Sequence, residues 1–165
     1  MARRTRADGA PAPPSGTAHA AALRLLGRRD YTRAELASRL AQRGYPADAI
    51  DTTLQRLAGE GLVDDRRVAA AHIRVASRVK GRGRLRIARE LETRGVAADL
   101  VREALAALPE EEDAEAIERI LSRRNVPARM SMANRRTLFQ QLLRRGFPSD
   151  AIARALRSRS GGNQS

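Results

Sequence analysis

One pattern of apolar residues occurs three times along the chain at a constant interval. In the first copy Leu36 and Leu40 precede Arg43-Gly44-Tyr45, and Ile50 and Leu54 follow it. Glycines at positions 44, 95 and 146 lie 51 residues apart, and residues of matching character surround each of them. The equivalent apolar positions in the other copies are Ile87, Leu91, Val96, Val101 and Leu105, then Leu138, Leu142, Phe147, Ile152 and Leu156. A repeat of this length is typical of stacked arrays.

The glycine of each copy predicts a turn between two helices. Leu36 and Leu40 are four residues apart, so they lie on one face of a helix. The residue just past a helix end often takes left-handed dihedral angles, which glycine adopts at little cost, and the apolar residue after it packs back on the helix. We therefore predict structural turns at Gly44, Gly95 and Gly146, each with a helix on either side.

Taken along the whole chain, the pattern predicts an all-α fold of nine helices in three tandem three-helix repeats. The first helix is expected from residue 18 to residue 28, and Thr32 and Glu35 form a capping box for the second. Asp64 or Asp65 is expected to cap the fourth helix. The predicted repeats cover residues 18–63, 64–108 and 109–157. A unit of this length buries only about 60% of its unfolded surface, so we expect the repeats to share apolar surface and to stack into an elongated, curved rod.

The two ends of the chain differ from this pattern. Residues 1–17 combine arginines with prolines and glycines and predict a disordered arm, and the last helix is expected to fray into a disordered tail over 158–165. No apolar run approaches the roughly 20 residues of a membrane span, and no signal-peptide core follows the first arginines. The chain contains no cysteine. These features predict a cytoplasmic protein without membrane contact.

Charge is distributed unevenly along the chain. The formal net charge is +13, and all but one of the 32 basic residues are arginine. Residues 66–94 carry 10 basic and 2 acidic side chains, residues 95–118 carry 1 and 8, and residues 119–165 carry 11 and 1. A preference for arginine over lysine does not explain so sharp a change between neighbouring segments. The basic segments therefore favour contact with phosphate or with an acidic protein surface.

The sequence gives no sign of catalysis, of a cofactor or of a bound metal. His19 and His72 are the only histidines and lie far apart, so a metal site is not expected. The acidic run 110–113 is explained by a favourable interaction with the dipole at the start of a helix. We find no nucleophile, base and orienting acid that would make a catalytic set.

Three motifs together point to a known family. They are Tyr31-Thr32-x-x-Glu35-Leu36-x-x-x-Leu40-x-x-x-Gly44-Tyr45, Leu57-x-x-x-Gly61-Leu62-Val63-Asp64-Asp65, and Lys80-Gly81-Arg82 leading to Ile87-x-x-Glu90-Leu91-x-x-x-Gly95-Val96. In these motifs the chain resembles the bacterial RecX family from Ala18 to Leu156. The resemblance implies a non-enzymatic regulator that lies in the groove of the RecA filament on single-stranded DNA. It implies inhibition of RecA recombinase and coprotease activity, and thus control of recombinational DNA repair and of the SOS response.

The expected contacts with RecA and, more weakly, with single-stranded DNA lie in the basic segments. Seven basic residues fall between positions 74 and 89 without an acid, and we expect their side chains to be solvated before the partner binds. The expected partner-binding residues are Arg74, Arg78, Lys80, Arg82, Arg84, Arg86 and Arg89, then Arg135, Arg136, Arg144 and Arg145. A monomer suits an elongated groove binder.

Two other classes of function remain open at this point. A DNA-binding helical-repeat regulator that acts without RecA is the main alternative, because a helix, a glycine turn and a helix resemble a helix-turn-helix. Asp48 and Asp99, in the first turn of the candidate reading helices, have the wrong sign for phosphates. A helical scaffold for some other acidic protein would differ from the RecA hypothesis only in its partner.

Overall fold

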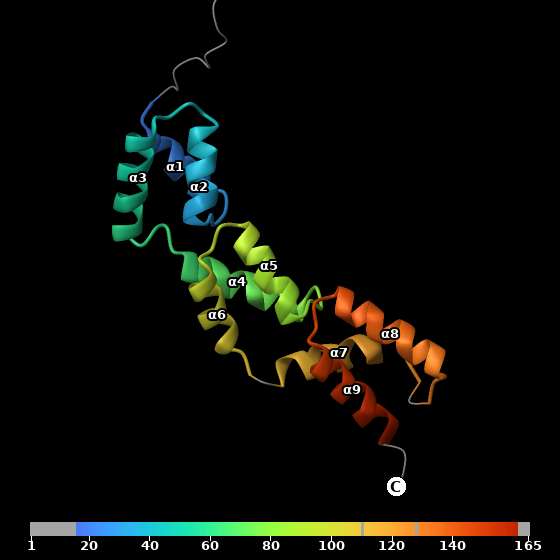
Figure 1. Cartoon of the computed structure of the whole chain (residues 1–165). Coiled ribbons are helices and arrows are strands. Elements are labelled where there is room, and N and C mark those ends of the chain that lie inside the picture. The colour runs from blue at the N-terminus through green and yellow to red at the C-terminus, as the bar shows by residue number, and fades with distance from the viewer. Residues whose placement is uncertain (1–15, 110, 128, 162–165) are drawn as a thin grey trace, which may run out of the picture. The chain divides into compact units, whose positions relative to one another are not determined.

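The computed structural model describes residues 16–109, 111–127 and 129–161, and these residues form helices and connecting loops without a β-strand (Figure 1). The helices are α1 (Ala18–Leu26), α2 (Arg33–Ala41), α3 (Ala47–Gly59), α4 (Asp65–Arg78), α5 (Arg84–Thr93), α6 (Ala98–Ala106), α7 (Glu112–Arg123), α8 (Met132–Arg144) and α9 (Ser149–Gly161). The predicted all-α class is confirmed. None of these helices is long and apolar enough to cross a membrane.

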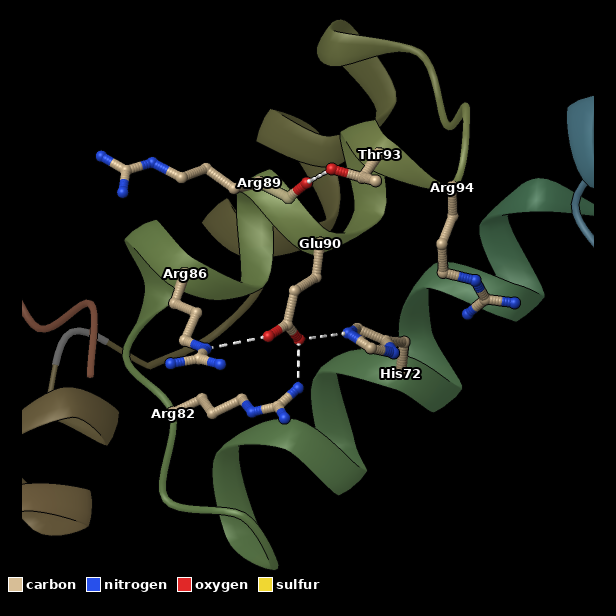
Figure 2. Close-up of a pocket in the computed structure, with 7 residues that line it drawn as sticks. All are labelled: His72, Arg82, Arg86, Arg89, Glu90, Thr93 and Arg94. Atoms are coloured by element: carbon tan, nitrogen blue, oxygen red, sulfur yellow. Dashed lines mark hydrogen bonds and ion pairs between the residues drawn. The ribbon is translucent and has the colours of Figure 1, made fainter. Parts of the chain in front are cut away.

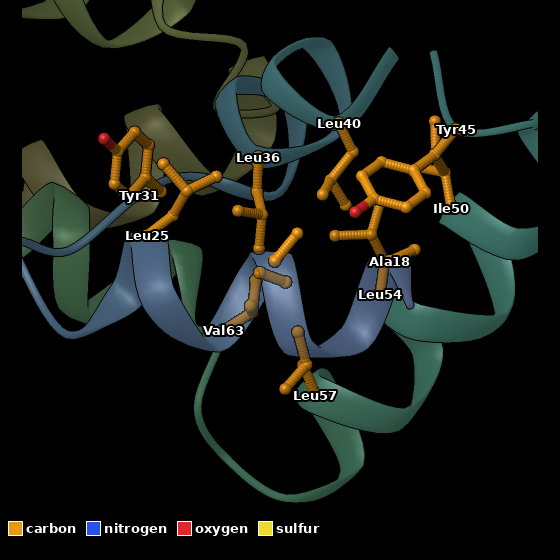
Figure 3. Packing of buried hydrophobic residues seen from close by; sticks show 12 residues of the cluster. Ala18, Leu25, Tyr31, Leu36, Leu40, Tyr45, Ile50, Leu54, Leu57 and Val63 are labelled. Atoms are coloured by element: carbon orange, nitrogen blue, oxygen red, sulfur yellow. The ribbon is translucent and has the colours of Figure 1, made fainter. Parts of the chain in front are cut away.

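The chain divides into two compact units at Asp65. In the first unit, α1, α2 and α3 enclose an apolar core in which Leu36, Leu40 and Leu57 are fully buried (Figure 3). The predicted capping box of α2 is confirmed. Thr32 Oγ1 accepts a hydrogen bond from the Glu35 amide at 3.0 Å, and Glu35 Oε2 accepts one from the Thr32 amide at 3.0 Å.

The second unit, residues 66–165, contains two further apolar cores. One lies among α4, α5 and α6 around Ile87 and Leu91. The other lies among α7, α8 and α9 around Ile117 and Phe147. Each core of the described chain thus belongs to three consecutive helices, while tandem repetition and a curved rod stay predictions.

The same local geometry occurs at the three glycines of the sequence pattern. Gly44, Gly95 and Gly146 have φ angles of +83°, +80° and +86°. The amide after each glycine donates a hydrogen bond to a carbonyl five residues earlier: Tyr45 to Leu40 at 3.3 Å, Val96 to Leu91 at 3.1 Å and Phe147 to Leu142 at 3.3 Å. The side chains of Tyr45, Val96 and Phe147 are buried. This combination is the Schellman type of helix end, which satisfies carbonyls that the helix leaves without an amide.

Several element boundaries differ from the sequence expectation. Helix α1 ends at Leu26, and Thr17, which the sequence assigned to a disordered arm, caps this helix by accepting a hydrogen bond from the Ala20 amide at 3.1 Å. Helix α9 continues to Gly161, beyond the expected start of the tail at Ser158. The carboxylate of Asp65, one of the two acids expected to cap the fourth helix, accepts a hydrogen bond at 2.8 Å from the amide of Arg33, the first residue of α2. Residues 1–15 and 162–165 of the expected arm and tail lie outside the described residues.

Within the second unit, the α4–α5 loop and the α8–α9 turn make direct backbone contact. The Gly83 amide donates to the Arg145 carbonyl at 2.9 Å, and the Leu85 amide donates to the Gly146 carbonyl at 3.0 Å. A Cβ atom on Gly83 would overlap the backbone of Gly146 and Phe147, and one on Gly146 would overlap Arg86. Glycine at both positions therefore lets the two backbones approach closely. We call this contact the glycine junction.

Candidate functional site

The basic run from Arg74 to Arg89 extends from the second half of α4, through the α4–α5 loop, into α5. Five of its members have exposed side chains, namely Arg74, Arg78, Lys80, Arg86 and Arg89. Arg82 and Arg84 are only about 27% and 31% exposed. The expectation that the whole run is solvated is therefore wrong for Arg82 and Arg84, because acidic side chains from elsewhere in the second unit draw them in.

Glu90 on α5 is the acid that pairs with Arg82 and Arg86 of this run, as Figure 2 shows. Its Oε1 accepts a hydrogen bond from Arg86 Nε at 3.0 Å, and its Oε2 accepts one from Arg82 at 2.5 Å. His72 on α4 lies with Nε2 3.0 Å from the same Oε2. One carboxylate thus joins α4, the α4–α5 loop and α5.

The environment of Glu90 changes the pKa of its carboxyl. Burial raises this pKa, but hydrogen bonds from Arg86, Arg82 and His72 together lower it more, so the pKa lies below its usual value of 4.5. A carboxylate with a lowered pKa in the folded state stabilises the fold above the unfolded pKa. That stabilisation is lost as the pH falls below 4.5 through the folded value.

We expect Glu90→Gln to reduce the loss of stability in acid. The free energy of unfolding, measured with urea at about pH 6 and about pH 3.5, should fall less in the variant than in the unchanged chain, because glutamine does not titrate. Glu103, an exposed acid that pairs with Arg66, offers a control. Glu103→Gln should leave the decrease in the free energy of unfolding between the two pH values nearly unchanged. If the free energy of unfolding fell by the same amount at the lower pH in the Glu90 variant and in the unchanged chain, the role given to Glu90 would be contradicted.

An open pocket of about 490 Å³ lies beside this carboxylate. Its lining residues are His72, Arg82, Arg86, Arg89, Glu90, Thr93 and Arg94 (Figure 2). Thr93 Oγ1 donates to the Arg89 carbonyl at 2.7 Å, so the threonine supports the helix rather than the pocket. Among the described residues that line the pocket, four are arginines and one is an acid, which gives the pocket a positive field.

Two of the predicted partner-binding residues hold the second unit together. Arg84 forms an ion pair with Asp113 of α7, and its amide also faces that carboxylate at 3.4 Å. Arg145 donates to the Gly81 carbonyl at 3.3 Å, beside the glycine junction. Burial, followed by the nearby charges of Arg124 and Arg86, lowers the pKa of Arg145. The structure thus brings Arg145, from the second predicted set, close to Arg86, from the first.

The remaining predicted residues lie on α8, apart from this pocket. Arg136 and Arg144 are exposed, and Arg135 is partly buried. Arg135 and Arg136 line a hollow of about 510 Å³ together with Met132 and Phe139. The structure therefore gathers one basic site around the α4–α5 loop and leaves a second group along α8.

The sequence analysis missed two buried acids at the start of α7. Ser77 Oγ donates to Glu112 Oε1 at 2.6 Å, and Arg119 donates to the same oxygen at 3.2 Å. Asp113 pairs with Arg84, as described above. These acids were interpreted only through the helix dipole, because their partners on α4 and α5 lie about 30 residues away and no local pattern marks them. Within the described residues, no group of His, Cys, Asp and Glu side chains could hold a metal ion.

Comparison with known proteins agrees with the arrangement of the helices. Residues 18–57 match the family model described as the first three-helix domain of RecX, and residues 64–105 match the second. The structure also resembles a crystal structure of RecX from Lactobacillus salivarius, with a TM-score of 0.77, 22% sequence identity, and coverage of 87% of this chain and 94% of that one. A second crystal structure, of regulatory protein RecX, gives a TM-score of 0.74 at 21% identity and covers 86% of this chain and 70% of that one. At these identities the likeness concerns the fold alone.

Sequence similarity is stronger among curated relatives. A regulatory protein RecX from Halorhodospira halophila is 44% identical over 144 residues, which cover 82% of this chain and 83% of the relative. A second, from Mycobacterium marinum, is 41% identical over 133 residues, which cover 79% and 77%. Together with the shared helical domains, this similarity shows that the chain belongs to the RecX family.

Proposed function

We propose that the chain is a non-enzymatic regulator that inhibits the RecA recombinase and its coprotease function. It would bind in the groove of the RecA filament on single-stranded DNA and so regulate recombinational repair and the SOS response in the cytoplasm. The observation that carries this proposal is the 44% identity, over 82% of the chain, to a relative named regulatory protein RecX. The dense positive charge of the second unit supports it, because both DNA and acidic protein surfaces attract such segments.

The proposed mode of binding depends on repetition within the chain. We propose that α1–α3, α4–α6 and α7–α9 are tandem repeats that stack into a curved rod and act as a monomer. The recurrent helix ends at Gly44, Gly95 and Gly146 support this proposal, as do the three separate cores. A rod with one contact per repeat could reach more than one RecA protomer, and several weak contacts would then add through a high effective concentration.

The principal contact is proposed to lie at the α4–α5 loop. Lys80 is exposed there, Arg82 and Arg86 pair with Glu90 beside it, and Arg74, Arg78 and Arg89 are exposed nearby. Arg135, Arg136 and Arg144 on α8 form the second proposed contact group. Arg84 and Arg145 act mainly through the fold, because their guanidinium groups already hold Asp113 and Gly81.

Replacing Lys80, Arg82 and Arg86 with alanine should weaken inhibition of RecA at least tenfold, which corresponds to about 1.4 kcal/mol of binding free energy. The measurement is the concentration of the chain that halves RecA-catalysed ATP hydrolysis on single-stranded DNA. A matched control replaces Arg28, Arg39 and Arg43, which are exposed on the first unit, and removes the same charge. We expect the first variant to fold with a small loss of stability, because Glu90 loses Arg82 and Arg86. Equal inhibition by both folded variants would move the contact away from this loop.

Salt dependence separates this function from a DNA-binding regulator that acts without RecA. Binding to bare single-stranded DNA should weaken steeply as salt rises, because each phosphate contact releases counterions. Binding to a RecA filament should persist, since protein contacts add to it. Fluorescence anisotropy over a salt series measures both affinities. Similar slopes with and without RecA would support the DNA-binding alternative.

A further inference from the structure

The pocket beside Glu90 is lined by more basic side chains than acidic ones. Arg82, Arg86, Arg89 and Arg94 line it, and Glu90 is the only acid among the described residues of its lining. Both carboxylate oxygens of Glu90 already contact donors, which belong to Arg86, Arg82 and His72. In the part of the chain that the structure describes, the guanidinium of Arg89 makes no ion pair or hydrogen bond, and Figure 2 shows it directed away from Glu90. The pocket therefore has a positive charge to offer to a further anion.

The position of Glu90 shows where such an anion would bind. Its carboxylate lies between the guanidinium groups of Arg82 and Arg86, in the geometry of charge-assisted hydrogen bonds. The partners come from three different segments, so the donors are held in place by α4, the α4–α5 loop and α5 rather than by one flexible strand of chain. Any anion that uses the same donors must compete with the Glu90 carboxylate.

A phosphate group fits the pocket better than a second carboxylate would. Its oxygens can accept from several donors at once, and arginine is suited to bind them in pairs. The open volume of about 490 Å³ leaves room for a phosphate and for the sugar attached to it. Arg145, close to Arg86 at the glycine junction, adds to the positive field on that side.

We propose that this pocket binds a phosphate group and that Glu90 occupies its donors as an internal competitor. When a phosphate enters, the Glu90 carboxylate leaves Arg82 and Arg86 and turns towards solvent, and both guanidinium groups transfer to the phosphate oxygens. Glu90 thus lowers the affinity of the free chain for phosphate-bearing ligands. The phosphate could belong to the backbone of single-stranded DNA or to a free nucleotide, since both present the same oxygens.

The test compares two variants that make the same change of charge. Glu90→Gln removes the competitor with little change in size, and Glu103→Gln removes one exposed negative charge elsewhere in the second unit. We expect Glu90→Gln to tighten binding of a fluorescent single-stranded oligonucleotide by about threefold to tenfold. Glu103→Gln should tighten it much less, because an exposed charge outside the pocket is screened. Unfolding curves measured in parallel show that both variants are folded.

A double replacement locates the effect. In a chain that carries Arg82→Ala and Arg86→Ala, the gain from Glu90→Gln should disappear, because the donors that Glu90 blocks are gone. Competition by ATP and by inorganic phosphate distinguishes the sources. Displacement of the oligonucleotide by ATP at low concentration would identify a free nucleotide as the ligand, whereas weak competition would identify the DNA backbone.

A measurement on the unchanged chain provides a second, independent test. On titration with inorganic phosphate, the side-chain Nε–H resonances of Arg82 and Arg86 should shift, and that of Arg56, which pairs with Glu60 on the first unit, should not. Equal gains from the two glutamine variants, or absent shifts at Arg82 and Arg86, would overturn the proposal. If Glu90→Gln increased the affinity only for an acidic peptide or for RecA, and not for the oligonucleotide, this result would also overturn the proposal, in favour of a protein ligand. If the chain fails to inhibit RecA while Glu90→Gln still tightens oligonucleotide binding, the proposed function fails and this inference stands.

Discussion

Replacing Gly146 with alanine should lower the free energy of unfolding of the second unit by about 2–5 kcal/mol. Two costs add at this position. A side chain at a φ of +86° is strained by about 1–2 kcal/mol. The new Cβ would also overlap Arg86, reaching 2.9 Å from its Cα atom, so the α8–α9 turn must move away from α5. That movement lengthens the backbone hydrogen bonds from Gly83 and Leu85.

Two further glycines separate strain from crowding. Gly83 has an ordinary φ of −78°, but its Cβ would overlap the backbone of Gly146 and Phe147, so Gly83→Ala should cost about 1–3 kcal/mol through crowding alone. Gly61 has a φ of +70° and open space around its Cβ, so Gly61→Ala should show only the strain of about 1–2 kcal/mol. Chemical unfolding followed by circular dichroism measures all three. If Gly83→Ala is as stable as the unchanged chain, the glycine junction is not formed as described.

The second large effect concerns the buried acids at the start of α7. Glu112→Ala and Asp113→Ala should each destabilise the second unit by about 1–3 kcal/mol, because each leaves polar partners without a hydrogen bond. Ser77 is buried and donates to Glu112, and Arg84 donates to Asp113. The measurement is the midpoint of urea unfolding compared with that of the unchanged chain.

Glu115 provides the control for these two acids. It lies on the same helix, in the first turn, and pairs with Arg119 at 3.5 Å, but its side chain is 65% exposed. All three acids interact with the helix dipole in a similar way. Glu115→Ala should therefore cost under about 1 kcal/mol. Equal losses at positions 112, 113 and 115 would mean that the dipole, rather than the buried hydrogen bonds, explains the acids.

The glycine turns and the capped start of α2 could be predicted from the sequence because they depend on neighbouring residues. A Schellman helix end needs a glycine and an apolar residue next to it, and both appear in the chain at Gly44 and Tyr45. The capping box at Thr32 and Glu35 likewise spans four consecutive positions. Such local rules hold in any chain. In this chain the pattern of a glycine followed by an apolar residue occurs at all three equivalent positions, 44, 95 and 146.

The contacts of the basic site could not be predicted in the same way. Glu90 follows the basic run by one residue, but its contact with His72 depends on how α4 packs against α5. The pairing of Arg84 with Asp113, and the approach of Gly83 to Gly146, bring together segments separated by about 30 and 60 residues. A count of charges along the chain treated the run as a uniform solvated face. Packing instead pairs Arg82 and Arg86 with Glu90 and Arg84 with Asp113, and it leaves the other members of the run exposed.

The glycine junction also determines how the α4–α5 loop meets proteases. Trypsin could cleave after three of five consecutive residues at this loop, namely Lys80, Arg82 and Arg84. The sequence of this stretch, with its two glycines, resembles that of an exposed linker. A protease must draw several residues into an extended form, but the amides of Gly83 and Leu85 are bonded to the α8–α9 turn. Cleavage therefore requires the junction to open first, and its rate follows the population of that open form. The rate of cleavage by trypsin in this loop therefore reports how often the contact between the α4–α5 loop and the α8–α9 turn opens.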